Sequence, residues 1–293
     1  MPFLQLTLEI GSQDPAPFED ALFDLGATAV TLEDAADDPV LEPAPGATPL
    51  WPTVRVKALF DAALDPGTLG RQVTERCGDA ARPAVELIGD RSWEREWLRD
   101  FRPMRFGRRL WVCPGGLPAG DPDGTRIELD PGLAFGTGTH ATTALCLEWM
   151  DRRDLAGLSV VDYGCGSGIL AIAALRLGAR RASAVDHDPQ ALEATRSNTQ
   201  QNAVTDRLLA FPPEDMPDDC ADILLANILA GPLIELASRL ATLVRPEGRI
   251  ALSGILCDQV AKVEEAYGPW FELDAPRVKD EWVILSGRRK SRP

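Results

Sequence analysis

The sequence predicts two domains of different class: a small α+β domain, followed by a larger doubly wound α/β domain with an antiparallel strand at its edge. Three observations lead there. The first 90 residues alternate strands and helices in a short, symmetrical order, strands and helices alternate regularly from about residue 155, and a glycine-rich loop follows the first strand of that second stretch. A chain of 293 residues is long enough for both domains.

The first 90 residues have the element order of a ferredoxin-like domain. Apolar and polar side chains alternate over residues 3–10, as in a strand with one buried face. Further strands are expected at residues 27–33, 54–60 and 84–88, and helices at residues 15–25 and 66–77. This order of strand, helix, two strands, helix and strand is that of the ferredoxin-like fold.

Residues 91–110 are aromatic and basic and are expected to form a linker helix and hinge. Ser92 is expected to be the N-cap, and Trp93, Trp97 and Phe101 recur at the spacing of one helix face. Two roles stay open for this segment. Its aromatic side chains can fasten the two domains together, or Phe101 and the arginines can border an active site. We place the domains at residues 1–90 and 111–293, on either side of this linker.

The larger domain is expected to contain a parallel sheet with helices on both faces. Strands at residues 159–163, 182–186, 223–226 and 249–253 alternate with helices at 168–177, 189–202, 229–243 and 258–267. The last two strands, at residues 271–273 and 282–286, have no helix between them and therefore predict an antiparallel hairpin at the edge. Such a Rossmann-like sheet is the architecture of most S-adenosylmethionine-dependent methyltransferases.

Composition excludes several functional classes. The six cysteines have no paired spacing and the two histidines are far apart, so we expect neither a disulfide framework nor a metal site. No apolar run reaches the length of a bilayer span and no signal segment opens the chain, which favours a cytoplasmic protein without a membrane partner.

Acidic residues are concentrated in the first domain. The formal net charge is −15, and residues 1–90 contain 16 Asp or Glu against 5 Lys or Arg. Such a field disfavours direct binding to nucleic acid and favours a basic partner. The alternative is that the acidity serves only solubility.

The glycine loop at residues 162–168 is the strongest candidate for a ligand site. Gly164, Gly166 and Gly168 allow the chain to turn tightly and to approach a ligand closely, at the start of a helix whose amides are free. Asp186 ends the next strand, 22 residues beyond Gly164, where a carboxylate can bind both hydroxyls of a ribose. Asp188 is better placed to cap the following helix. Because the spacing is not the G-x-G-x-x-G of NAD sites, the ligand predicted is S-adenosylmethionine.

Two further segments are expected at the same site. Asn227 follows a strand at the carboxyl edge of the sheet, where it can offer an amide to the cofactor or to an amine, or cap the next helix. The segment before the first strand is rich in Gly and Thr and contains Phe135 and Thr137, which predicts a lid over the cofactor. His140 can act as a base or make a structural hydrogen bond, and Thr143 can donate to the cofactor.

Four motifs together closely resemble the bacterial ribosomal protein L11 methyltransferase family. They lie at residues 101–107, 130–140, 162–170 and 227–232. The resemblance implies methylation of lysine side chains and of the N-terminal amine of ribosomal protein L11, with S-adenosylmethionine as the cofactor. By matching positions, it places cofactor contacts at Thr143, Gly164, Asp186 and Asn227. It also implies that the ferredoxin-like domain holds the protein substrate.

We interpret Asn227 as the catalytic residue, one that orients the amine for in-line attack, and we expect a monomer. Three alternatives stay open at this stage. The chain can methylate RNA or a small metabolite, it can be a non-catalytic acidic module that binds a basic ribosomal protein, or it can be a dehydrogenase.

Overall fold

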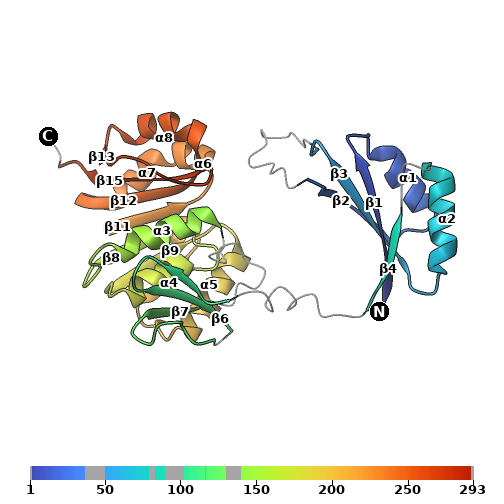
Figure 1. The fold of residues 1–293 in the computed structure, drawn as a ribbon. Coiled ribbons are helices and arrows are strands. Elements are labelled where there is room, and N and C mark those ends of the chain that lie inside the picture. Colours follow the sequence, from blue (N-terminus) through green and yellow to red (C-terminus); the bar gives the residue numbers. More distant parts are fainter. Residues whose placement is uncertain are drawn as a thin grey trace. The chain divides into compact units, whose positions relative to one another are not determined.

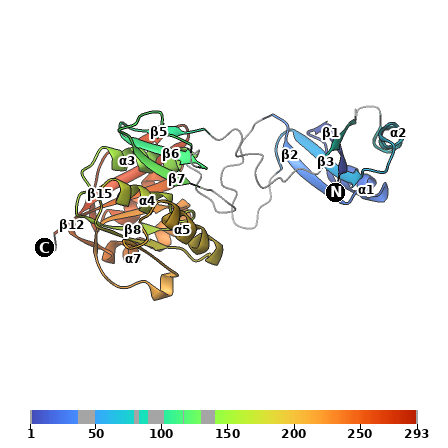
Figure 2. The ribbon, with the colours of Figure 1, turned by 90° about the horizontal axis from the view of Figure 1, so that it is seen from below.

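The computed structural model describes residues 2–36, 50–78, 83–89, 102–115, 117–129 and 140–291. The chain divides into two compact units, Met1–Glu96 and Trp97–Pro293. Each unit is described by itself below (Figures 1 and 2). None of the helices among the described residues combines the length and the apolar composition that a membrane span requires.

The first unit is a four-stranded antiparallel sheet with two helices on one face, the ferredoxin-like arrangement expected. Its elements are β1 (Phe3–Gly11), α1 (Ala16–Asp24), β2 (Ala29–Asp34), β3 (Val54–Asp61), α2 (Pro66–Cys77) and β4 (Ala84–Ile88). The strand order is β2-β3-β1-β4, and every neighbouring pair is antiparallel. Alternate residues of β1, such as Leu6, are buried against Leu22 of α1 and Val73 of α2, which is why the period-two pattern predicted this sheet.

The second unit has an eight-stranded mixed sheet as its centre. Its strands are β8 (Ser159–Tyr163), β9 (Arg181–Val185), β10 (Leu208–Phe211), β11 (Ala221–Asn227), β12 (Val244–Leu256), β13 (Phe271–Leu273), β14 (Arg277–Lys279) and β15 (Trp282–Arg289). The order is β10-β9-β8-β11-β12-β15-β13, with β14 also paired to β15. Strands β8 to β12 are parallel, and β15 is antiparallel to β12.

The antiparallel strand expected at the edge lies one position further in. Strand β15 enters between β12 and β13, so that β13 forms the edge. The apolar residues of β15, among them Val283 and Leu285, are buried, whereas β13 is only three residues long and ends half-buried at Leu273. The more apolar of the two strands therefore takes the inner position.

Helices cover both faces of this sheet (Figure 1). The helices are α3 (Ala141–Asp151), α4 (Ile169–Arg176), α5 (Pro189–Gln201), α6 (Ala230–Glu235), α7 (Ala237–Thr242) and α8 (Val260–Tyr267). Helices α3, α4 and α5 pack on one face, and α6, α7 and α8 on the other. The residues from 229 to 243, expected as one helix, form two short helices that meet at Leu236.

A small third sheet, not anticipated from the sequence, packs on the outer side of α3, α4 and α5. It consists of β5 (Met104–Phe106), β6 (Leu110–Pro114) and β7 (Thr125–Leu129). Its first strand lies within residues 91–110, where a linker helix was expected. Residues 91–101 are outside the described residues, but residues 104–106 form a strand rather than a helix.

The reason for this difference is the turn that follows β5. Gly107 has a φ of +69°, and the backbone N–H groups of Arg108 and Arg109 donate to the buried carboxylate of Asp151 at 2.6 and 3.0 Å. These bonds fix a hairpin in which Met104 pairs with Val112. A distant acidic side chain, rather than local periodicity, therefore decides the structure of this segment.

Candidate functional site

The candidate site lies at the carboxyl ends of the central parallel strands. Tyr163 at the end of β8 is paired with Val185 at the end of β9 and with Ala226 of β11. The ends of these strands and the segments that follow them therefore lie side by side, and they carry Gly164, Asp186 and Asn227. Open α/β sheets bind their ligands at such an edge, where neighbouring connections leave in opposite directions.

The glycine loop has a backbone that other residues would not adopt without strain. Gly164, Gly166 and Gly168 have φ values of +78°, +52° and +77°. A Cβ atom at Gly164 would overlap Cγ2 of Ile228, and one at Gly168 would lie 2.8 Å from Oγ1 of Thr195. The absence of side chains at Gly164 and Gly168 therefore lets the loop pack closely against Ile228 and Thr195.

Two side chains of α5 hold the loop from below. The Thr195 hydroxyl donates to the carbonyl of Gly166 at 2.9 Å, and the Asn198 amide donates to the carbonyl of Ser167 at 2.9 Å. Both side chains are buried. The loop is thus anchored through its carbonyls, and its shape is fixed before any ligand binds.

Asp186 links the loop to the second strand. Its Oδ2 accepts from the N–H of Gly166 at 2.9 Å, and its Oδ1 accepts from the N–H of Asp188 at 3.0 Å. The side chain is 10% exposed. Each carboxylate oxygen has more than one acceptor site, so the group can still accept hydroxyl donors from a ligand at the sheet edge. Asp188 caps α5 by accepting from the N–H of Gln190 at 2.9 Å, as the sequence indicated.

His187 lies beside this acid and is almost fully exposed. Its Nδ1 is 3.5 Å from Oδ1 of Asp186, and its side chain is 92% exposed. It therefore presents an imidazole at the surface of the site without enclosing it.

Asn227 meets Thr143 on the other side of the loop. The Asn227 side-chain amide donates to the Thr143 hydroxyl at 3.3 Å. Thr143 lies in the first turn of α3 and is buried. This bond fixes the plane of the Asn227 amide, whose oxygen can accept a hydrogen bond from an amine.

Ile228 connects the Asn227 turn to the glycine loop. Its side chain packs against Gly164, and a Cβ at Gly254 would overlap its carbonyl oxygen. Gly254 has a φ of +84° and lies where the register between β12 and β15 shifts. Sequence reasoning missed Gly254, although an isolated glycine within a strand pattern is a known sign of a bulge or of a close backbone approach.

His140 serves the structure of α3. It is the N-cap of the helix, its Nδ1 is 2.8 Å from the Thr142 hydroxyl, and its ring contacts Trp282 edge to face with centroids 5.0 Å apart. Burial lowers the pKa of His140, which favours the neutral ring. These contacts account for the residue without a role as a base.

Asp162 is a buried acid directly beneath the loop. One oxygen accepts from the N–H of Ala171 at 3.0 Å, while Oδ1 has no hydrogen-bond partner in the described part of the chain. Burial raises the pKa of Asp162 to about 7, with Asp186 adding to the shift and the Ala171 bond opposing it. Near neutral pH this carboxyl group is therefore partly protonated.

A short 3-10 helix, η3 (Pro213–Asp215), adds a further candidate wall to the site. It follows β10, whose last residue, Phe211, is paired with Val185 and accepts from the N–H of Asp186 through its carbonyl. Sequence reasoning missed this segment because β10 is only four residues long. The lid residues Phe135 and Thr137 lie outside the described residues.

The assembled groups fit a ligand that contains both a ribose and charged or polar ends. The glycine loop offers backbone groups at the sheet edge, Asp186 offers a carboxylate at the neighbouring strand, and Asn227 offers an oriented amide. These are the groups that a nucleoside-containing cofactor requires at the switch point of an α/β sheet.

Comparison with known proteins identifies close relatives. A family model described as ribosomal protein L11 methyltransferase (PrmA) matches residues 2–290. A ribosomal protein L11 methyltransferase from Hahella chejuensis is 53% identical over 289 residues, which are 99% of each chain. One from Pseudomonas aeruginosa (strain LESB58) is 51% identical and covers 99% of this chain and 100% of the relative.

A solved structure also matches. The crystal structure of a ribosomal protein L11 methylase from Lactobacillus delbrueckii subsp. bulgaricus has a TM-score of 0.60 and is 32% identical in sequence. The match covers 65% of this chain and 100% of that chain.

Proposed function

The chain belongs to the ribosomal protein L11 methyltransferase family, and from this premise we propose that it transfers methyl groups from S-adenosylmethionine to amino groups of ribosomal protein L11. The acceptors proposed are lysine side chains and the N-terminal amine. The family match extends over both units of the chain, residues 2–290. A function that needs both units therefore fits better than one that uses the sheet alone.

The observation that carries the proposal is the convergence of Gly164, Asp186 and Asn227 at one sheet edge. The proposed cofactor contacts are Thr143, Gly164, Gly166, Asp186 and Asn227, together with Phe135 and Thr137 of the lid. Asp186 would accept the ribose hydroxyls, and the glycine loop would pack against the nucleoside and methionine portions. When bound, S-adenosylmethionine supplies a sulfonium whose methyl group is already activated for displacement.

The residues of the chain then have to align the amine with the methyl group, and they do not have to activate the methyl group. The sheet edge and the turn at Asn227 would orient the amine toward the methyl group of the cofactor, and such positioning lowers the entropic part of the barrier. A lysine amine has an ordinary pKa of about 10.4 and must lose a proton before it attacks. We propose that this proton passes to solvent, while the Asn227 oxygen accepts a hydrogen bond from the remaining N–H and orients the lone pair.

We propose separate roles for the parts of the chain, based on the excess of acidic residues in residues 1–90. Residues 1–90 would bind the protein substrate and residues 111–293 would hold the cofactor. Within residues 91–110 the proposed hinge precedes Met104, because β5 and the turn after it belong to the second unit. Residues 1–90 contain 16 acidic and 5 basic side chains, a balance that attracts a basic protein and repels nucleic acid. We propose a cytoplasmic, monomeric enzyme with L11 as its partner and without direct contact to nucleic acid.

Labelled methyl groups test this function against its rivals. Cell lysate is incubated with the enzyme and methyl-labelled S-adenosylmethionine, and label is counted in the protein, RNA and small-molecule fractions. We expect one labelled protein band of the size of L11. Label in RNA or in metabolites would instead support a different acceptor, and binding of L11 without any label would support an acidic docking module.

The role of Asn227 has its own prediction. Asn227→Ala removes the acceptor that orients the amine and one proposed cofactor contact, but leaves the glycine loop and Asp186 in place, so kcat should fall about tenfold or more while the cofactor dissociation constant rises less than it does for Asp186→Ala. Single-turnover methylation with saturating cofactor measures the first quantity, and calorimetric titration the second. Full turnover with intact cofactor binding would remove Asn227 from the mechanism.

A further inference from the structure

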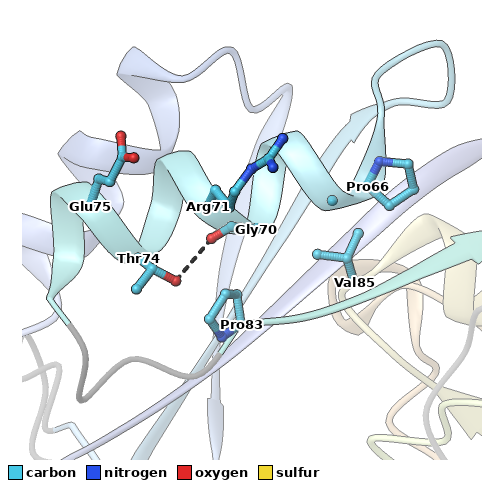
Figure 3. Close-up of a pocket in the computed structure, with 8 residues that line it drawn as sticks. Pro66, Gly70, Arg71, Thr74, Glu75, Pro83 and Val85 are labelled. Atoms are coloured by element: carbon cyan, nitrogen blue, oxygen red, sulfur yellow. Dashed lines mark hydrogen bonds between the residues drawn. The ribbon is translucent and has the colours of Figure 1, made fainter.

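A groove on the first unit lies between helix α2 and the segment that contains strand β4. It has a volume of about 750 Å³ and is lined by Pro66, Gly67, Gly70, Arg71, Thr74, Glu75, Pro83 and Val85 (Figure 3). The helix supplies one wall, and the segment that contains β4 supplies the other. Nothing in the proposed chemistry at the sheet edge uses this groove.

Two glycines on α2 keep the groove open. A Cβ at Gly70 would reach no closer than 3.9 Å to the Pro83 ring, and one at Gly67 would lie 3.5 Å from its neighbour Asp65. Neither glycine has a positive φ, so neither is required by the backbone. Glycine in a helix costs about 0.5–1 kcal/mol relative to alanine. The two glycines therefore lower the stability of α2 at the positions where they leave space in the groove.

The floor of the groove is apolar and continues along β4. Val85 is paired with Leu6, and Leu87 with Leu4. Because Leu4 and Leu6 are buried beneath the helices, the side chains of Val85 and Leu87 lie on the same helix-covered face of the sheet. The helix does not cover the end of this strand, and Leu87 is 66% exposed. An apolar side chain that entered beside Leu87 would bury surface that is now in contact with water.

Strand β4 is also an open edge of the sheet. Among the described residues it pairs with β1 alone. In an antiparallel pair every second residue of an edge strand turns its N–H and C=O groups outward, where another strand can bind them. An edge strand beside a helix, with a groove between them, is the arrangement in which a peptide binds by strand addition.

The charges around the groove indicate what kind of strand it accepts. Three of the four basic side chains described in this unit pair with acids, in the ion pairs Arg55–Glu9, Lys57–Glu33 and Arg76–Asp24. Arg71 donates a hydrogen bond to the Thr68 hydroxyl and interacts electrostatically with Asp65, but it forms no ion pair within the described residues. Next to it, Glu75 has no ion pair within the described part of the chain.

A further acid lies on the same helix. Asp65 stands at the start of α2, where the hydrogen bonds from Thr68 lower its pKa. Asp65 and Glu75 together outnumber Arg71 on α2, and residues 1–90 as a whole have the same sign of charge. A segment with lysine or arginine side chains at its ends matches this charge.

We propose that an extended, basic segment of the protein substrate adds to β4 as a fifth strand, with one apolar side chain in the groove beside Val85 and a basic side chain at Glu75. This inference rests on the proposed function, and it locates the contact by which the first unit holds the substrate. Because this contact lies on the first unit, it determines the affinity for the substrate. The chemical step takes place at the second unit.

Filling the groove tests the proposal. Gly70→Leu places a side chain in the space between α2 and Pro83, and its helix propensity is better than that of glycine. The matched control is Gln72→Leu, which adds a leucine to an exposed position of the same helix outside the groove. We expect Gly70→Leu to raise the KM for L11 about tenfold or more, since a well-packed anchor in an interface commonly contributes that much affinity. The control should raise it less than about twofold.

The two variants also separate this proposal from the proposed function. If the wild-type enzyme methylates L11 and both leucine variants have the same KM, the groove is not the docking site. If the wild-type enzyme transfers no methyl group to L11, the proposed function fails first.

Hydrogen exchange tests binding at the groove independently of methyl transfer, because it requires only that L11 associates with the protein. In the full-length protein with saturating L11, the amides within residues 84–88 that do not bond to β1 should exchange about tenfold or more slowly than without L11, since the added strand would accept their hydrogen bonds. Strand β2 forms the other edge of the same sheet and is the internal control. Protection at β2 and not at β4, or at neither, would overturn the proposal.

Discussion

Replacement of Gly164 by alanine should damage both the fold and the cofactor site, by amounts that can be separated. Gly164 has a φ of +78°, and a Cβ at this position would overlap Cγ2 of Ile228. Ile228 directly follows Asn227, so a displacement of Ile228 moves the amide proposed to orient the amine. The substitution therefore acts on the loop and on the catalytic turn together.

The expected magnitude has two parts. A non-glycine residue in the left-handed region costs about 1–2 kcal/mol, and overpacking of a full site costs about 1–3 kcal/mol more. Gly157 isolates the first part, because it has a φ of +74° but nothing within 4 Å of an added Cβ. Gly157→Ala should therefore lose about 1–2 kcal/mol of unfolding free energy, and Gly164→Ala about 2–5 kcal/mol.

The two variants should differ even more in binding. Urea denaturation gives the unfolding free energies, and calorimetric titration with S-adenosylmethionine gives the dissociation constants. We expect the constant to rise about 10- to 100-fold for Gly164→Ala, equivalent to about 1.4–2.8 kcal/mol, and to stay unchanged for Gly157→Ala. If Gly164→Ala is too unstable to purify, the addition of Ile228→Ala should recover part of the loss. Equal stability and equal affinity in the two single variants would refute the steric reasoning.

Two further predictions concern the acids around the loop. Asp186→Ala should weaken cofactor binding about tenfold or more, because it removes the proposed ribose acceptor and the partner of the Gly166 N–H. Asp188→Ala should lower the unfolding free energy by about 1 kcal/mol through the lost helix cap. In the same titration, Asp188→Ala should leave the cofactor affinity unchanged. Asp162 has a pKa of about 7 when folded against 3.8 as its ordinary value, so the fold favours its protonated form, and this contribution is complete below about pH 4 and lost as the pH rises through 7. Asp162→Asn keeps a neutral group of the same shape at every pH. The unfolding free energy of the variant minus that of the wild type should therefore increase between about pH 5 and about pH 8. A constant difference across that range would contradict the raised pKa of Asp162.

Much of the fold could be predicted because its patterns are local. The alternation over residues 3–10 and the limits of α2 at Pro66 and Cys77 follow from period and capping alone, and α2 is capped by Asp65. Strand β8 and the start of α5 at Pro189 were also predicted at their observed positions. In each of these segments local preference and tertiary structure agree.

The parts that were missed depend on distant contacts. The hairpin after β5 is fixed by Asp151, which is more than 40 residues away in sequence. The loop anchors Thr195 and Asn198 lie on a helix whose sequence reads as an ordinary amphipathic one, and only the fold shows that they face the carbonyls of the glycine loop. Such pairings have no signature in a single sequence, because either partner alone is an unremarkable polar residue.

The candidate site falls between these two cases. Gly164, Asp186 and Asn227 could be proposed from the rule that parallel strands place ligands at their carboxyl ends. The bond between Asn227 and Thr143 could not, since it joins residues 84 positions apart. The same is true of Gly254, whose contact with Ile228 becomes evident only when β12 and β11 lie together.

Mass spectrometry of purified ribosomal protein L11 tests the central claim most directly. L11 is incubated with the enzyme and S-adenosylmethionine, and its intact mass and peptide masses are compared with those from a reaction that contains the Asp186→Ala variant. The account predicts that the mass of L11 rises in steps of one methyl group, located on lysine side chains or on the N-terminal amine, and that the variant slows the rise. An unchanged mass of L11 with active, cofactor-bound enzyme would contradict it.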